Sequence, residues 1–232
     1  MAKPDAHWLE SLPKSRLIAE FSLWSADLAA LRADLARVER HVDMLHIDVS
    51  DGHFTAALLF FPDQIAALRK ATAKPMHVHL MVTGAVLLSQ IEQFAEAGAD
   101  LISIHAETDP AILRQAFARI TDLGVKAGLV LQLETPVAQA EAWLEHVAIL
   151  TLVSTPIGIK GVQPDETTYL RLAEARALLD AKAPQVILAA DGGIREHTVP
   201  RMRAEGAQTV VLGSLAFNAP DLGARMAWLA AL

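Results

Sequence analysis

Short apolar runs alternate with longer amphipathic stretches along nearly the whole chain. The longer stretches, such as LAALRADLARVERH, VLLSQIEQFAEAGA and PAILRQAFARITDLG, repeat apolar residues at steps of three and four, which is typical of helices with one buried face. The short runs have the length and composition of buried strands. The predicted strands are Leu17–Leu23, Met44–Asp48, Met76–Met81, Leu101–His105, Lys126–Leu131, Ile149–Ser154, Val186–Ala190 and Thr209–Leu212. The last helix is predicted to begin near Pro220.

This pattern amounts to successive strand–helix units at a spacing of roughly 25–30 residues, the size of a βα repeat. No Pro/Gly/Ser-rich linker divides them, so we expect one domain. A doubly wound open sheet is the main competitor, but it usually has about five or six strands, and the larger count favours a closed barrel. We therefore predict an α/β fold, a single-domain (β/α)8 TIM barrel over residues 17–232, after a polar N-terminal leader over residues 1–16.

Composition narrows the functional classes. The net charge of −7 argues against a nucleic-acid-binding protein, which needs a basic face. Cysteine is absent, so neither disulfides nor thiolate metal sites are available. No apolar stretch approaches the roughly 18 residues of a membrane span, and the first residues lack the apolar core of a secretory signal. We expect a soluble, cytoplasmic protein that interacts with neither nucleic acid nor membrane.

Polar side chains gather at the predicted strand ends, where parallel barrels carry their catalytic groups. His46 and Asp48 are two apart on one strand, so their side chains share a face. His79 and Asp191 end two other strands. These nitrogen and oxygen ligands suit one divalent Zn, Fe, Mn or Co ion, and the residues do not choose among these metals. A hydrogen-bonded polar layer above the core is the alternative.

Glycine-rich turns follow the seventh and eighth predicted strands, in the segments ADGGIREHT and LGSLAFNAP. Turns at these places are the usual phosphate site of such barrels, because backbone amides at helix starts point at the anion. Gly192 and Gly193, with Gly213 and Ser214, therefore form a candidate phosphate site. A Gly-Gly pair alone can also simply mark a tight turn.

Several segments together resemble the ribulose-phosphate 3-epimerase family. LHIDVSDGHF lies around the second predicted strand, and HLMV, FAEAGADLISIHAE, ADGGI and LGSLAF follow along the chain. The early FSLWSAD is similar to the Ser-Ile-Leu-Ser-Ala-Asp start of that family. The resemblance covers nearly the whole chain after the leader.

The resemblance implies an isomerase of carbohydrate metabolism that epimerises a ketose phosphate at carbon 3, with one divalent metal ion as cofactor and a homo-oligomeric assembly. It assigns metal binding to His46, Asp48, His79 and Asp191. It assigns the acid/base pair to Asp48 and Asp191. It assigns substrate contacts to Ser22, His79, Gly161, Gly192, Gly193, Gly213 and Ser214.

The chain departs from the family pattern after the sixth predicted strand. A Pro-Gly-Phe-Gly-Gly-Gln loop is usual there, whereas this chain has STPIGIKGVQPDE, with Lys160 in it. Ser50 stands where the family usually has a methionine. These changes leave the sugar open between ribulose 5-phosphate/xylulose 5-phosphate and a hexulose phosphate such as allulose 6-phosphate. Lys160 either reaches the substrate or faces solvent.

Two other functions compete with epimerisation. Sugar-phosphate decarboxylases on related barrels typically carry Asp-x-Lys-x-x-Asp, and the comparable segment from Asp48 to Asp51 has no lysine. A non-catalytic barrel that binds a sugar phosphate is the second competitor. His105 is expected either to touch substrate or to pack behind the site. Asp51 is expected either to cap a loop or to act as a ligand, and Trp24 is a candidate wall of the pocket.

Overall fold

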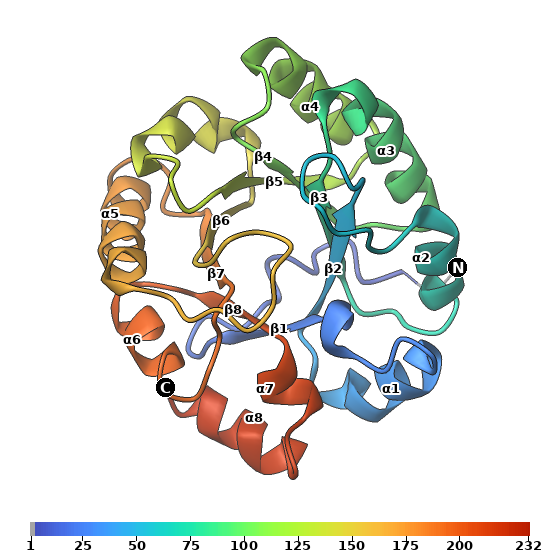
Figure 1. Cartoon of the computed structure of the whole chain (residues 1–232), viewed down its shortest axis with the longest axis vertical. Coiled ribbons are helices and arrows are strands. Elements are labelled where there is room, and N and C mark those ends of the chain that lie inside the picture. Colours follow the sequence, from blue (N-terminus) through green and yellow to red (C-terminus); the bar gives the residue numbers. More distant parts are fainter. Residues whose placement is uncertain (1–2) are drawn as a thin grey trace.

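The computed structural model describes residues 3–232, which form a closed barrel of eight parallel strands in sequence order. The barrel is surrounded by helices (Figure 1). This arrangement confirms the predicted TIM barrel. The strands are β1 (Ile18–Ser22), β2 (Met44–Ser50), β3 (Met76–Met81), β4 (Leu101–His105), β5 (Lys126–Leu131), β6 (Ile149–Val153), β7 (Ile187–Asp191) and β8 (Thr209–Leu212).

Helices follow the strands along the chain, and their apolar faces pack on the outside of the barrel. The helices are α1 (Leu31–Val38), α2 (Pro62–Arg69), α3 (Gly84–Ala97), α4 (Pro110–Asp122), α5 (Glu166–Lys182), α6 (Val199–Ala204), α7 (Ser214–Phe217) and α8 (Leu222–Ala230). Shorter 3-10 segments are η1 (Leu23–Ser25), η2 (Glu39–His41) and η3 (Val137–His146). The connection between β5 and β6 is thus the 3-10 segment η3. No helix among residues 3–232 is long and apolar enough to cross a bilayer.

Four strands (β3, β4, β5 and β8) have the predicted bounds, and the bounds of β1, β2, β6 and β7 differ from the predicted ones by one or two residues. β1 ends at Ser22, because Leu23 already begins a 3-10 turn. β2 continues to Ser50, because that residue still pairs with Met81 of β3. Strand ends depend on the neighbouring strand as well as on the local sequence, so local pattern does not determine them.

The barrel interior is layered along its axis. At the N-terminal end of the strands, Trp8 and Leu12 of the segment before β1 are buried. They pack in one cluster with residues of β1, β2, β4, β6 and β7, which are Ile18, Met44, Leu101, Ile149 and Ala189. Polar side chains fill the interior toward the other end. The apolar layer therefore closes the bottom of the barrel, and the polar layers lie beneath the opposite rim.

Candidate active site and metal centre

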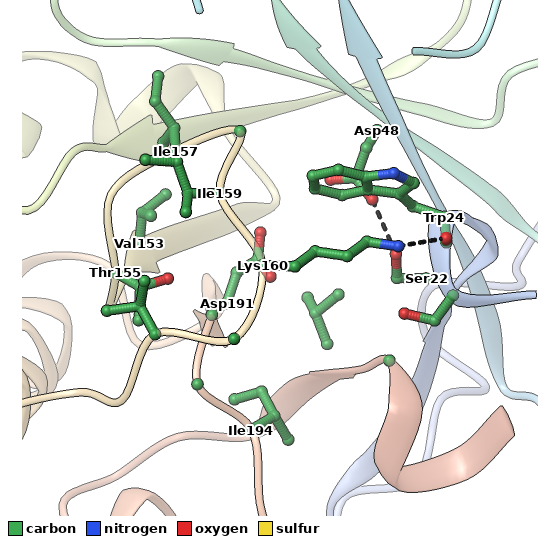
Figure 2. Close-up of a pocket in the computed structure, with 18 of the residues that line it drawn as sticks. Ser22, Trp24, Asp48, Val153, Thr155, Ile157, Ile159, Lys160, Asp191 and Ile194 are labelled. Atoms are coloured by element: carbon green, nitrogen blue, oxygen red, sulfur yellow. Dashed lines mark hydrogen bonds between the residues drawn. The ribbon is translucent and has the colours of Figure 1, made fainter. Parts of the chain in front are cut away.

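A cavity of about 330 Å³ opens at the C-terminal ends of the strands. Figure 2 shows its wall, in which the loop after β6 faces the side of the cavity formed by β1 and β2. The cavity is lined by the predicted site residues Ser22, Asp48, His79, Gly161, Asp191, Gly192, Gly193, Gly213 and Ser214. His46 does not line it, because this side chain is fully buried one layer below. The barrel thus brings all the predicted site residues to one end.

Two histidines and two aspartates converge at the cavity floor. His46 Nε2 lies 3.3 Å from Asp48 Oδ1 and 3.9 Å from Asp191 Oδ2. His79 Nδ1 lies 3.7 Å from the same Asp48 atom and 3.8 Å from the same Asp191 atom. The four side chains offer one donor atom each, all within 4.8 Å of one another. The strand register explains this convergence, because Asp48 pairs directly with His79 across β2 and β3.

This donor set fits a divalent cation. Metal–ligand bonds of about 2.1 Å in a tetrahedral site separate the ligand atoms by about 3.4 Å, close to the distances between the histidine nitrogens and the carboxylate oxygens. His46 Nε2 and His79 Nδ1 are both buried and have no hydrogen-bond partner. Buried polar nitrogens are normally satisfied, so their orientation toward two carboxylates is typical of metal ligands. A second group, with His46, Glu20 and His77, is instead joined internally by hydrogen bonds.

The two aspartates differ in proton affinity. Burial raises the pKa of Asp191, and the neighbouring negative charge of Asp48 raises it further. Burial acts in the same direction on Asp48, but the nearby His46 and His79 rings outweigh it and lower the pKa of Asp48 well below its usual range. Burial alone would lower the pKa of His46, whereas Asp48 and Glu20 raise it. The anionic surroundings that raise the pKa of His46 also attract a cation.

Ser22 holds one of these carboxylates in place. Its hydroxyl donates to Asp48 Oδ2 at 2.8 Å (Figure 2). Asp48 therefore has one oxygen toward the histidines and the other on Ser22. Trp24 lies two residues further along and lines the cavity, as expected for a wall residue.

Glu20 and His77 were not predicted as site residues. Glu20 is fully buried in β1, and its Oε1 lies 2.7 Å from His46 Nδ1 and 2.6 Å from His77 Nδ1. His77 Nε2 in turn lies 2.6 Å from Ser103 Oγ. One signal was available, since Glu20 is an acidic residue in an apolar strand, two positions before Ser22 and on the same face. Its partners were not readable, because they come from other strands.

His105 packs behind the site. Its Nε2 lies 2.9 Å from His79 Nε2, and its Nδ1 lies 3.0 Å from Glu107 Oε2. Glu107 also accepts hydrogen bonds from the Thr135 hydroxyl and from the Gln132 amide. Burial lowers the pKa of His105 to about 4, so this ring is neutral near pH 7. Of the two expectations for His105, contact with the histidine cluster is the one observed.

The turn after β7 packs closely against the loop after β6. Gly192 and Gly193 have φ of 93° and 64°, a left-handed backbone that favours glycine. A Cβ on Gly192 would lie 2.4 Å from Thr155 Oγ1, and one on Gly193 would lie 2.4 Å from Pro164 Cδ. Arg195, which was not predicted, lines the same end of the cavity. A cation two residues after a Gly-Gly turn was its available signal.

Comparison with known proteins agrees with this geometry. The model of the Ribulose-phosphate 3 epimerase family matches residues 18–217. Ribulose-phosphate 3-epimerase of Bacillus subtilis is 34% identical over 202 residues, which cover 86% of this chain and 92% of that protein. The chloroplastic ribulose-5-phosphate-3-epimerase of Arabidopsis thaliana is 31% identical over 92% of this chain and 76% of its own length. The chain belongs to the ribulose-phosphate 3-epimerase family. It is accordingly an enzyme of the isomerase class, an epimerase.

Solved structures add the fold alone. The 3-hexulose-6-phosphate synthase of Salmonella typhimurium superimposes with a TM-score of 0.69 at 15% identity, over 93% of this chain and 97% of that one. The 3-keto-L-gulonate-6-phosphate decarboxylase of Vibrio cholerae gives a TM-score of 0.67 at 16% identity. Both share the barrel with this epimerase.

Two further residues of the epimerase have structural roles after β2. Asp51 caps the loop, because its carboxylate accepts hydrogen bonds from the amides of His53, Phe54 and Thr83. Ser50 does not line the cavity, and its hydroxyl donates to the carbonyl of Ala57 at 2.8 Å. The residue that replaces the usual methionine therefore hydrogen-bonds local backbone and does not face the cavity.

Proposed function

We propose that this epimerase interconverts ketose phosphates at carbon 3, with a divalent cation held by His46, Asp48, His79 and Asp191. The observation that carries the proposal is the pair of buried, unpartnered ring nitrogens directed at two carboxylates at the cavity floor. A cation held there supplies a Lewis acid for the negative charge that develops on the substrate oxygens, worth several kcal/mol.

Asp48 and Asp191 act as the acid/base pair in this proposal. They belong to β2 and β7, which are separated around the barrel by β8 and β1, so they approach the cavity from different sides. Epimerisation requires removal of a proton from one face of carbon 3 and delivery of a proton to the opposite face. The opposed pKa shifts of the two carboxyls suit one base and one acid. In the reverse reaction the two residues exchange roles.

The phosphate is proposed to bind between the turns after β7 and β8. Gly192, Gly193, Gly213 and Ser214 line that side of the cavity, and Arg195 adds a cation there. Glycine permits close approach of the anion to backbone amides. Asp48 and Asp191 line the same cavity as these turns. A short sugar chain can therefore reach from the phosphate site to the acid/base pair.

The covering loop, residues 155–163, is proposed to select the sugar. Lys160 reaches across the cavity, where its Nζ donates to the Trp24 carbonyl at 2.7 Å and lies 4.3 Å from the centre of the Trp24 ring (Figure 2). Partial burial lowers the pKa of Lys160, and Asp48 opposes this shift. Gly161, with φ of 87°, follows directly in the cavity wall. A ligand of the right length must displace or share the contacts of Lys160, so this cation discriminates between substrates.

The decisive experiment measures exchange of the carbon-3 hydrogen with deuterium oxide. Purified enzyme is incubated with ribulose 5-phosphate or allulose 6-phosphate, before and after chelation of divalent cations. We expect stereochemically inverted product with solvent deuterium at carbon 3, dependent on the cation. Tight binding of both sugars without exchange would favour the sugar-phosphate-binding barrel instead.

A further inference from the structure

The two histidines of the cluster each have a second ring nitrogen that faces away from it. For His46 this atom is Nδ1, which lies 2.7 Å from Glu20 Oε1. For His79 it is Nε2, which lies 2.9 Å from His105 Nε2. A neutral imidazole carries its hydrogen on one nitrogen and its lone pair on the other. Whatever holds the outer nitrogen therefore decides whether the inner one can bind a cation.

Glu20 determines the hydrogen position on His46. An ionised carboxylate only accepts hydrogen bonds, so both rings that contact Glu20 Oε1 must place their hydrogen on Nδ1. Thr209 contacts the other oxygen, Oε2, at 3.2 Å. The lone pair of His46 is then on Nε2, the nitrogen that lies 3.3 Å from Asp48. The same logic leaves His77 Nε2 to accept from the Ser103 hydroxyl at 2.6 Å.

Glu107 determines the hydrogen position on His79 through an intervening ring. Because Glu107 accepts, His105 must place its hydrogen on Nδ1, and its Nε2 becomes an acceptor. His79 must then donate from Nε2, so the lone pair of His79 is on Nδ1. That nitrogen has no hydrogen-bond partner and faces both aspartates. The backbone N–H of Gln132 donates to the other oxygen of Glu107, Oε1, at 2.9 Å, so that oxygen also acts as an acceptor.

We propose that Glu20 and Glu107 are positioning residues that set the tautomers of His46 and His79, one directly and one through His105. Each carboxylate also holds its ring in the orientation that directs the lone pair at Asp48 and Asp191. The part of the proposal that concerns the cation rests on the proposed function, whereas the tautomers are a property of the protein alone. Loss of a carboxylate in this position typically weakens metal binding by about 10- to 100-fold.

The substitution Glu107→Gln is expected to move the hydrogens of His105 and His79 to their other ring nitrogens. The Gln132 amide still needs an acceptor, so the new side chain turns its oxygen there and its NH₂ group toward His105. His105 Nδ1 must then accept, its hydrogen moves to Nε2, and His79 Nε2 becomes the acceptor. The hydrogen of His79 is thereby moved to Nδ1, where it points into the cluster. The whole chain of hydrogen bonds inverts without loss of side-chain volume.

Nitrogen-15 NMR of the cation-free protein in alkaline buffer reads these tautomers without any activity measurement. In the unsubstituted protein we expect hydrogen on Nε2 of His79 and on Nδ1 of His105, His46 and His77. In Glu107→Gln the hydrogen should lie on Nδ1 of His79 and on Nε2 of His105. The opposite tautomers in the unsubstituted protein, or no change in Glu107→Gln, would overturn the proposal. The reading on the unsubstituted chain remains decisive if Glu20→Gln, at a fully buried site, does not fold.

Cation affinity is the second readout, measured by competition between Co²⁺ and a coloured chelator. Glu20→Gln and Glu107→Gln should each bind about 10- to 100-fold more weakly, and excess Co²⁺ should restore turnover. Glu134→Gln, an exposed change of the same charge, is the control and should match the unsubstituted protein. Unchanged affinity in both buried variants would refute the positioning role. If the unsubstituted protein binds no cation at this cluster, the proposed function fails while the tautomer result stands.

Discussion

The candidate ligand cluster (His46, Asp48, His79 and Asp191) and the covering loop belong to one site but are built differently. His46, Asp48 and His79 are buried on adjacent strands, held by the backbone ladder of β2 and β3. The loop of residues 155–163 has no regular structure, and Ile159 within it is 58% exposed. Its cross-barrel contacts include Lys160 with Trp24 and the hydrogen bond from Thr55 Oγ1 to the Ile157 carbonyl at 3.3 Å.

This difference separates chemistry from selection. Groups that hold a cation and move a proton must stay within fractions of an ångström of their working positions, which packed strands provide. A loop with few contacts can change or open at little cost to stability, and such segments commonly gate or discriminate. Substitutions in the cluster should therefore reduce the rate for every substrate, whereas substitutions in the loop should change the ratio between substrates.

The largest effect is expected for the acid/base pair. Asp48→Asn and Asp191→Asn each remove a proposed proton carrier and a proposed charged ligand, so turnover should fall at least about 10³-fold, or about 4 kcal/mol in the barrier. The measurement is kcat for both sugar phosphates, with exposed Asp122→Asn at the end of α4 as control. Near-normal turnover by either buried variant would mean that another residue moves the proton.

Removal of the cation should be nearly as severe. Loss of several kcal/mol of charge stabilisation corresponds to a decrease of about 10²-fold or more in kcat. Metal analysis before and after dialysis against a chelator, with activity followed in parallel, tests this. Activity should return when Zn²⁺, Fe²⁺, Mn²⁺ or Co²⁺ is added back. Full activity with the cluster demonstrably empty would contradict the mechanism.

An intermediate effect is expected at the phosphate turns. A Cβ on Gly213 would lie 2.7 Å from Ser25 Oγ, so Gly213→Val should crowd the anion and raise KM about tenfold or more while kcat changes less. The control for a bulky residue outside the cavity is Gly223→Val at the exposed start of α8, where a Cβ approaches only Asp221 Oδ1, at 3.3 Å. Equal activity of the unsubstituted enzyme on phosphorylated and free sugars would count against this phosphate site.

The smallest effect on rate, but the clearest on preference, is expected for Lys160→Met. It removes the cation and its contacts with Trp24 while leaving the cluster untouched. We expect the ratio of kcat/KM between ribulose 5-phosphate and allulose 6-phosphate to change by about tenfold, or about 1.4 kcal/mol. Exposed Lys70→Met at the end of α2 should leave the ratio unchanged.

Grafting a Pro-Gly-Phe-Gly-Gly-Gln loop in place of residues 155–163 extends the same comparison. The graft should shift preference toward ribulose 5-phosphate, because extra glycines loosen the backbone over the substrate. A hundredfold preference for ribulose 5-phosphate before the graft, and no change after it, would show that this loop does not select the sugar.

The four ligand candidates were predictable from the period of a strand and from their places near strand ends. His46 and Asp48 are two apart, and the period of a strand is two, so a shared face follows from sequence alone. Residues at the C-terminal ends of parallel strands meet at one rim of a barrel, which brought His79 and Asp191 to the same site.

The hydrogen bonds beneath the cluster were not predictable in this way. Glu20 meets His46 and His77 because closure of the barrel sets β1 against β2 and fixes the stagger between strands. The inward turn of Trp8 into the bottom of the barrel likewise depends on contacts with distant strands. Ser50 shows the same limit, since its hydroxyl is used by a neighbouring carbonyl and not by the cavity.

Sequence periodicity by itself therefore determined the number of strands, the inward faces and the rim that carries the chemistry, because each follows from backbone geometry over a few residues. Tertiary structure alone decided which nitrogen of each histidine faces the cluster, because that depends on acceptors such as Glu20 and Glu107. His79 meets Glu107 only through His105 of another strand. Hydrogen-bond partners of this kind are defined by distance and angle between strands, and linear spacing carries neither.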